Sequence, residues 1–209
     1  MMTQTTASSL LGRAERPFTV RFSKPDSADR IELVHFISDI FHRNYGLHQN
    51  SGERIKHLNL YLMSLRDQND QLIAACGLRS ASFEKLHLES FLNQPIEVML
   101  SEHGGTPVER GNIIEIDNFT VENLDMARYL VAAINDQLHF TSKYWAVFTS
   151  VLTVSDEFSK LGMHPIVLAD ADKSRLPAEE QEEWGSYFNQ KPQVIAIRRM
   201  ERRKNPRGT

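Results

Sequence analysis

The sequence predicts a single α+β domain in which helices pack against one mixed β-sheet. Two observations lead to this class. The first half of the chain has strand-like segments separated by a short polar loop, as in hairpins, and the second half alternates strand-like and helical segments. The length of 209 residues suits one well-cored domain and is short for two. We therefore expect one domain over 17–201, a loose Ser/Thr-rich segment over 1–16 and a basic tail over 202–209.

The overall composition is that of an ordinary globular protein, with 41% hydrophobic and 24% charged residues. The formal net charge of -3 argues against a nucleic-acid-binding protein. No run approaches the ~20 consecutive apolar residues that a transmembrane helix needs, and the first residues lack the pattern of a secretory signal. The single cysteine, Cys76, excludes an internal disulfide framework and fits a reducing compartment. We therefore expect a cytoplasmic protein with no transmembrane segment.

The first half begins with a half-buried strand, because Phe18, Val20 and Phe22 alternate with polar residues. A helix follows, with its apolar side chains on one face and Gly46 at its end, where glycine readily takes the left-handed conformation. Two strands joined by a hairpin loop come next, and then two short helical segments before a Gly/Pro loop. The predicted ranges are 31–45 for the helix, 58–66 and 72–79 for the strands, and 86–92 and 96–102 for the short helical segments.

Strands and helices alternate in the second half. Residues 112–121 are strand-like, and apolar side chains at helical spacing follow over 124–141. Residues 145–151 are rich in strand-forming types. The remaining predicted elements are a short helix from a Ser155 cap to Gly162, a strand over 165–168, an acidic helix from Pro177 through Trp184 and a last strand over 194–198.

The segment 156–168 carries a motif in which a short helix ends in Leu161-Gly162-Met163 and a strand follows. Gly162 supplies the left-handed turn that ends the helix, and Met163 is expected to fill the core. With the preceding strand, helix and strand, this motif resembles the Leu-Gly-Phe signature of the GNAT acyltransferase superfamily, over residues 58–200. The resemblance implies a mixed, mostly antiparallel GNAT-like sheet with helices on both faces and a splayed central strand pair.

The glycine-containing phosphate loop of that superfamily is missing here. The stretch 121–127 has no glycine and carries Glu122 and Asp125, whose charges oppose the binding of a pyrophosphate at the helix N-terminus. The usual mode of coenzyme A binding is therefore not expected. Coenzyme A and the phosphopantetheine of an acyl-carrier protein are both candidate donors that the resemblance implies.

Two further motifs resemble those of acyl-homoserine-lactone synthases, which share this fold and take acyl groups from a carrier protein. Gly77 and Arg79 match a Gly-x-Arg strand, and the segment from Glu115 to Phe119 matches a Glu-x-Ser-Arg-Phe strand, with Asn118 in place of the arginine. The Trp-rich N-terminal motif of those synthases is absent. The resemblance implies a small-molecule acceptor, with an acyl-carrier protein as a candidate partner.

Motifs spread over most of the chain are similar to those of the thermostable hemolysin family. They are GLRSA from Gly77, LESFLNQPIE from Leu88, IIEIDNF after Arg110, WAVFTSV from Trp145, Lys160-Leu161-Gly162, LADADKSRL from Leu168 and WGSYF from Trp184. The chain is identified by this resemblance as a member of the family. The family name implies membrane lysis, but the sequence has no toxin-like segment, and a fold does not by itself determine a function.

Glu115 is the leading catalytic candidate. It lies mid-strand between Ile114 and Ile116, so its carboxylate points away from two apolar neighbours. Partial burial is expected to raise its pKa and to suit it as a general base. The alternative is a structural ion pair with Arg79 or Arg110, and the sequence does not choose between the two. Arg79 is equally a candidate for binding a carboxylate or a phosphate.

Other side chains are expected to bind the substrate. Asn118 is suited to orient a polar group, and Trp184 with Tyr187, three residues apart on a predicted helix, either wall a pocket or anchor the core. Ser159 stands where many GNAT enzymes carry a tyrosine acid, and serine is a poor replacement. The complete set of expected substrate-binding residues is Arg79, Asn118, Phe119, Trp145, Phe148, Thr149, Trp184 and Tyr187.

Metal and thiol chemistry are not expected. The eight histidines are scattered, and His35 and His42 on the first helix are seven residues apart, so no zinc-like pairing occurs. Cys76 alternates with Ala75 in an apolar strand, which favours an inert core thiol.

These observations favour an acyltransferase-like protein of the GNAT fold that moves an acyl group from a carrier protein or coenzyme A to an amine. In this hypothesis Glu115 removes the amine proton, Arg79 and Asn118 hold the acceptor, and the strand that starts at Trp145 lines the acyl channel. Two alternatives stay open. One is a membrane-lytic hemolysin, and the other is a catalytically silent binding domain that has lost the phosphate loop.

Overall fold

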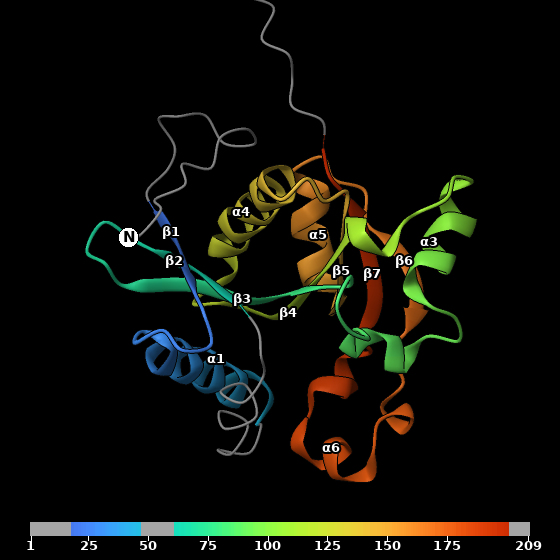
Figure 1. Ribbon diagram of the computed structural model, residues 1–209. Coiled ribbons are helices and arrows are strands. Elements are labelled where there is room, and N and C mark those ends of the chain that lie inside the picture. The colour runs from blue at the N-terminus through green and yellow to red at the C-terminus, as the bar shows by residue number, and fades with distance from the viewer. Residues whose placement is uncertain (1–17, 47–60, 201–209) are drawn as a thin grey trace, which may run out of the picture.

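The computed structural model describes residues 18–46 and 61–200. The loose segment expected over 1–16, the basic tail expected over 202–209 and the first three residues of the strand expected over 58–66 lie outside the described residues. Within the described ranges the chain forms one seven-stranded sheet with helices on both faces, which confirms the predicted fold class (Figure 1).

The strand order in the sheet is β1-β2-β3-β4-β5-β7-β6, so β4 lies at the centre. Neighbouring strands of this sheet are antiparallel except for β4 and β5, which run parallel. A parallel pair needs a crossover connection, and helix α4 provides it. The strands are β1 (Thr19–Ser23), β2 (Tyr61–Arg66), β3 (Leu72–Ser80), β4 (Ile113–Val121), β5 (Trp145–Ser150), β6 (Ile166–Asp170) and β7 (Gln193–Arg198).

The central strands β4 and β5 pair only near their first residues. Their ladder runs from Ile113 opposite Trp145 to Glu115 opposite Val147. Beyond that point β4 continues to Val121 paired with β3, while β5 continues paired with β7. The two strands therefore diverge, as the splayed central pair of the sequence-based prediction requires.

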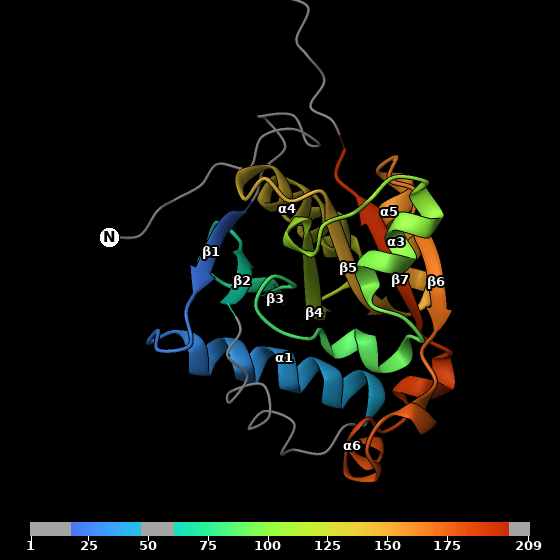
Figure 2. The ribbon, with the colours of Figure 1, turned by 45° about the vertical axis from the view of Figure 1, so that its right-hand side comes forward.

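Helices cover both faces of the sheet (Figures 1 and 2). Helix α1 (Arg30–Tyr45) packs on one face, because Leu33, Ile37 and Phe41 fall at helical spacing and are buried. Gly46, with a left-handed φ of 65°, ends α1 as predicted. The opposite face is covered by α4 (Ala127–Phe140) and α5 (Leu152–Lys160). The shorter α3 (Ile96–Gly104) lies over the other half of the sheet, where it packs against side chains of β5 and β7, and α6 (Ala178–Glu183) follows β6 in the chain.

The alternation of side chains along β4 decides which residues face which layer. Ile114 and Ile116 are buried in the core cluster built around α4 and α5. Ile113 belongs to the cluster on the opposite face, with side chains from α3 and β7. Because successive side chains of a strand point to opposite faces, Glu115 and Asp117 lie on the same face as Ile113 and α1.

Some predicted helix boundaries differ from the structure. Helix α5 begins at Leu152, so Ser155 lies inside it and does not cap it. The segment expected over 86–92 is a 3-10 helix, η1 (His87–Phe91), and the helix expected from 124 becomes α-helical only at Ala127. Propensity arguments locate helix ends poorly, because the first turn is decided by tertiary contacts as much as by sequence.

The described residues show neither a membrane-spanning helix nor a cluster of metal ligands. Within residues 18–46 and 61–200, every helix is too short or too polar to cross a bilayer. The same residues bring together no group of three or more His, Cys, Asp or Glu side chains that could hold a metal ion. Burial raises the pKa of the Cys76 thiol in β3, and the charge of Asp117 adds to the shift, so the reactive thiolate is disfavoured.

Candidate functional site

A pocket opens where β4 and β5 diverge, on the face of the sheet that α1 covers. It contains about 650 Å³ of space, part of which is continuous with the solvent. Its floor is β4, and its walls come from the end of β5, the last turns of α1, η1 and the segment after α6. The lining residues are Phe41, Tyr45, His87, Phe91, 115–119, 149–151, Trp184, Tyr187 and Phe188.

The floor of the pocket is irregular at Asn118. Asn118 has a positive φ of 51°, a left-handed conformation that asparagine tolerates better than most residues. The pairing of β4 with β3 shifts register around this position. The side chain of Phe119 is thereby turned toward the α5 side, where its ring lies 6.2 Å from the ring of Phe158. The irregularity thus separates the acidic part of the floor, at Glu115 and Asp117, from an apolar part.

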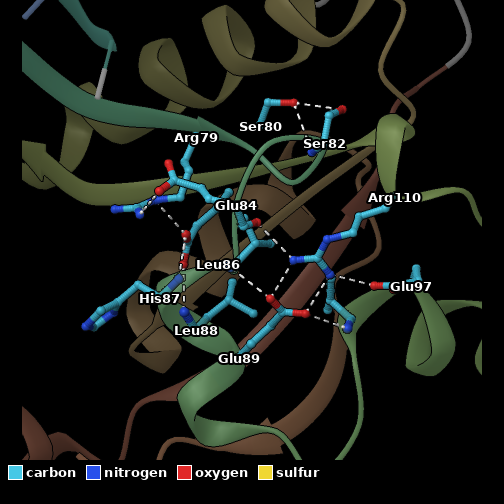
Figure 3. A network of polar contacts seen from close by, with 12 residues as sticks. Arg79, Ser80, Ser82, Glu84, Leu86, His87, Leu88, Glu89, Glu97 and Arg110 are labelled. Atoms are coloured by element: carbon cyan, nitrogen blue, oxygen red, sulfur yellow. Dashed lines mark hydrogen bonds and ion pairs between the residues drawn. The ribbon is translucent and has the colours of Figure 1, made fainter. Parts of the chain in front are cut away.

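The Glu115 carboxylate is almost completely buried and is held by the backbone of η1. The N–H of Leu88 donates to Oε1 at 2.8 Å, and the N–H of His87 donates to Oε2 at 3.0 Å. The Nε atom of Arg79 lies 3.3 Å from Oε2. Figure 3 shows how η1 presents His87 and Leu88 beside Arg79. The predicted ion pair of Glu115 is therefore formed with Arg79, whereas Arg110 has other partners.

Arg79 stands among three carboxylates. Besides Glu115, its guanidinium lies 3.4 Å from Glu84 and 3.8 Å from Asp117. The Arg79 side chain is 12% exposed, whereas that of Glu84 is 49% exposed. One guanidinium cannot neutralise three carboxylates, so this part of the site carries an excess of negative charge when all of them are ionised.

The surroundings of Glu115 shift its protonation toward higher pH. Burial raises the pKa of Glu115, and the charge of Asp117 raises it further. The amide donors and Arg79 offset part of this shift. A carboxylate with a raised pKa is a stronger base than an ordinary one, and each Glu115 oxygen keeps a lone pair beyond the one that an amide occupies. Glu115 can therefore accept a proton from a group in the pocket.

A second buried carboxylate holds η1 in place. Glu89 accepts two hydrogen bonds of 2.7 Å from the guanidinium of Arg110, which also donates to Glu97 at 2.7 Å. The N–H groups of Leu86 and Ile96 donate to Glu89 as well. Burial acts to raise the pKa of Glu89, but these donors outweigh it and leave the pKa below its ordinary value. Figure 3 shows Arg110 between Glu89 and Glu97, so this clamp fixes the segment that binds Glu115.

Aromatic rings form the wall opposite the floor. The rings of Tyr45 and Tyr187 meet edge to face at 5.1 Å, and the ring of Trp184 lies 5.2 Å from that of Tyr187. The prediction of one helix through Trp184 and Tyr187 is wrong, because α6 ends at Glu183 and Gly185 takes a positive φ of 48°. A Cβ at Gly185 would lie 2.2 Å from the carbonyl oxygen of Tyr45, so glycine permits the close approach to α1.

Most residues expected at the site line this pocket. They are Glu115, Asn118, Phe119, Thr149, Trp184 and Tyr187, and Arg79 lies behind Glu115. Trp145 and Phe148, which were also expected to bind the substrate, are not among the residues that line it. Trp145 packs in the cluster around Ile113, at the other end of β5, and the Phe148 ring packs at 4.8 Å on that of Phe158, on the opposite face.

Sequence reasoning missed several residues of the pocket, among them Asp117, Tyr45 and His87. Asp117 could have been found, because it stands two residues after Glu115 and side chains two apart share a face of a strand. Tyr45 and His87 also line the pocket, but they come from α1 and η1. No local pattern indicates which part of the chain those elements meet.

The junction of β4 and α4, where GNAT enzymes have the phosphate loop, is occupied by internal contacts. The backbone N–H of Glu122 donates to the carbonyl of Ile73 at 3.0 Å, and that of Met126 donates to Asn123 at 3.0 Å. The carboxylate of Glu122 pairs with Arg43 at 3.4 Å. These amides are therefore engaged inside the protein, and a negative charge stands beside them.

The chain is similar to known proteins in its sequence and in its fold. The sequence matches the family described as "Thermostable hemolysin" over residues 23–202. No curated protein matches the sequence significantly.

Several solved structures share the fold. The acyl-homoserine lactone synthase LasI has a TM-score of 0.60 and 10% identity, over 88% of this chain and 91% of that chain. FeeM, an N-acyl amino acid synthase from uncultured soil microbes, has a TM-score of 0.53 and 13% identity, over 90% and 92%. The CoA-dependent acyl-homoserine lactone synthase BjaI has a TM-score of 0.52 and 11% identity, over 86% and 82%. These structural similarities show that the chain shares a GNAT-like fold, and at identities this low they show the fold alone.

Proposed function

The chain belongs to the thermostable hemolysin family. We propose that this member of the family is an acyltransferase that acylates an amine bound in the pocket. The fold that it shares with acyl-homoserine lactone synthases and with an N-acyl amino acid synthase supports this class of reaction. The observation that carries the proposal is the opening between β4 and β5 with Glu115 in its floor. In this proposal the thioester and the amine meet in this opening.

Glu115 is the proposed general base. An ammonium group in the pocket gives one proton to the Glu115 carboxylate and becomes a nucleophilic amine. The amine nitrogen then attacks the thioester carbonyl carbon, a C–N bond forms, and the C–S bond breaks. The second amine proton passes to the leaving sulfur, so the products are an amide, a free thiol and protonated Glu115. Solvent at the open end of the pocket takes up the proton from Glu115 and restores the base.

The other site residues have supporting roles in this proposal. Arg79 acts through Glu115, since it lies 3.3 Å from that carboxylate and does not line the pocket. Asn118 and Thr149 supply polar groups on either side of the opening, where the acceptor and the thioester carbonyl meet. The acyl chain lies along the diverging part of β5, between Thr149 and Val151.

The contacts at the β4–α4 junction favour a donor that is not held by a standard phosphate loop. We propose an acyl-carrier protein, whose own surface supplies much of the binding energy, and coenzyme A is the alternative donor. The engaged amide of Glu122 and its carboxylate support this preference, because phosphate binding there would need free N–H groups and no negative charge.

Acetyl-coenzyme A is accordingly expected to bind weakly, with no saturation at low-micromolar concentrations. Isothermal titration calorimetry of the full chain checks this expectation. A dissociation constant near 1 μM, which corresponds to about −8 kcal/mol, would contradict the argument from the junction. Glu122→Gln serves as an internal test, because removal of the opposing charge should strengthen any residual binding.

The proposed function is tested by mass spectrometry of reaction mixtures. The full chain is incubated with acyl-coenzyme A or with acyl-carrier protein, together with a panel of amines, and the mixture is searched for amides. The expected result is an amide that requires the protein and one of the two donors. Absence of any amide, together with release of dye from lipid vesicles, would overturn the proposal in favour of the lytic activity that the family name implies. Absence of both would leave a binding domain without catalysis.

A further inference from the structure

The rings around the pocket are well suited to a cation. Tyr45, Trp184, Tyr187, Phe91 and Phe188 all line the same space, on the side opposite the β4 floor. They form a connected group, because the rings of Trp184 and Phe188 lie 5.8 Å apart and those of Phe91 and Phe188 lie 6.0 Å apart. The faces of such rings attract a positive charge at distances up to about 6 Å, and the attraction grows when water is excluded.

The charged residues in the pocket also favour a positively charged ligand. Glu115 and Asp117 are the carboxylates in the floor, and among the described residues that line the pocket no lysine or arginine occurs. His87 also lines the pocket, and its Nε2 atom lies 3.4 Å from Glu180. Arg79, behind the floor, faces three carboxylates. A ligand here therefore meets aromatic faces and negative charge.

We infer that the amine acceptor of this pocket is a hydrophobic amine of arylalkyl type, bound as its ammonium ion and carrying no carboxylate. This assignment deepens the proposed function and rests on it for the role of the ligand as an acceptor. In this assignment the ammonium pairs with Asp117, which lines the pocket with a side chain 17% exposed and lies two residues from Glu115 on the same face of β4. The apolar body of the ligand packs among the rings.

The same features exclude an amino acid as the acceptor. The carboxylate of an amino acid would lie within a pocket whose ionised lining groups are negative, with no arginine or lysine of the described lining to pair with it. Burial of an unpaired charge beside like charges is strongly unfavourable. An alcohol of the same shape would fill the aromatic part of the pocket but would leave Asp117 without a cationic partner.

Three ligands of one shape separate these possibilities. Isothermal titration calorimetry of the full chain, without any acyl donor, is performed with 2-phenylethylamine, phenylalanine and 2-phenylethanol. We expect 2-phenylethylamine to bind at least ~10-fold more tightly than either of the others, a difference of about 1.4 kcal/mol. Equal binding of phenylalanine or 2-phenylethanol would overturn the inference, and so would the absence of binding by all three ligands.

Two matched variants test whether the negative charge of Asp117 binds the ammonium. Asp117→Asn keeps the shape of the floor and is expected to weaken 2-phenylethylamine binding by ~10-fold or more. Glu84→Gln removes another carboxylate beside Arg79, outside the lining residues, and is expected to leave binding within about twofold. Equal losses in the two variants would contradict a direct contact at Asp117. Since no donor is present, amine binding without acylation would refute the proposed function alone, whereas acyl transfer to phenylalanine would refute this inference alone.

Discussion

Replacement of Glu115 by glutamine is expected to lower the rate of acyl transfer by ~10²–10⁴-fold, the usual contribution of general acid–base catalysis. Glutamine has nearly the same shape as glutamate but cannot accept the amine proton. The rate of the natural protein should rise with pH through the pKa of Glu115, because only the ionised carboxylate is a base, and this rise should disappear in the variant. Initial rates over a pH series measure both effects.

The same variant is expected to lose a moderate part of its stability. Glutamine has one acceptor oxygen for the two amide donors of His87 and Leu88, so one buried N–H is left without a partner, at a cost of ~1–3 kcal/mol. Arg79 is not left alone, because Glu84 and Asp117 remain beside it. Thermal denaturation followed by circular dichroism measures this loss, and rates are compared well below the lower melting temperature.

The pH dependence of stability provides a further check on Glu115. Its pKa is higher in the folded protein than in the unfolded chain, so its favourable contribution is present at low pH and is lost as the pH rises through the folded pKa. Glu115→Gln should remove that decline. Full activity in a folded Glu115→Gln protein would show that Glu115 is structural and that another group takes the proton. Glu84→Gln is the control, since it also changes the carboxylates around Arg79 and should keep both activity and stability.

Replacement of Arg110 by methionine is expected to lower the free energy of unfolding by up to ~3–5 kcal/mol, because the buried Glu89 carboxylate loses its cationic partner. The stranded partner is Glu89, whose side chain is 5% exposed, and Arg110 supplies two of its hydrogen bonds. Urea denaturation of the natural and variant proteins measures the difference. The loss of the Arg110 side chain should also reduce acyl transfer, because η1 would no longer hold its amides against Glu115.

Two further variants distinguish the buried charge from a general loss of packing. Adding Glu89→Gln to Arg110→Met removes the stranded charge and should recover part of the lost stability. Arg21→Met breaks an exposed ion pair with Asp70, whose side chains are 40% and 60% exposed, and should cost no more than ~1 kcal/mol. A cost for Arg110→Met no larger than that of Arg21→Met would show that the clamp on η1 contributes little.

The order and type of the elements could be predicted because the information is local. Alternation at Phe18, Val20 and Phe22 and helical spacing along α1 both depend on residues a few positions apart, and so does the turn at Gly46. The central position of β4 and its divergence from β5 were expected only through the resemblance to GNAT enzymes. The end of α6 was mispredicted, because Gly185 takes its conformation where the chain meets Tyr45.

For the candidate site, the sequence by itself determined which residues are candidates for the chemistry: Glu115 mid-strand in an apolar run, Arg79 in a neighbouring strand, and a β4–α4 junction without glycine. Only the tertiary structure decided what these groups meet. The amides of His87 and Leu88 reach Glu115 from 28 and 27 residues away, and Ser186 contacts the carbonyl of Tyr45 from 141 residues away. The physical reason is that burial, charge pairing and the facing of side chains into a pocket arise from packing between distant segments, which no spacing within one segment encodes.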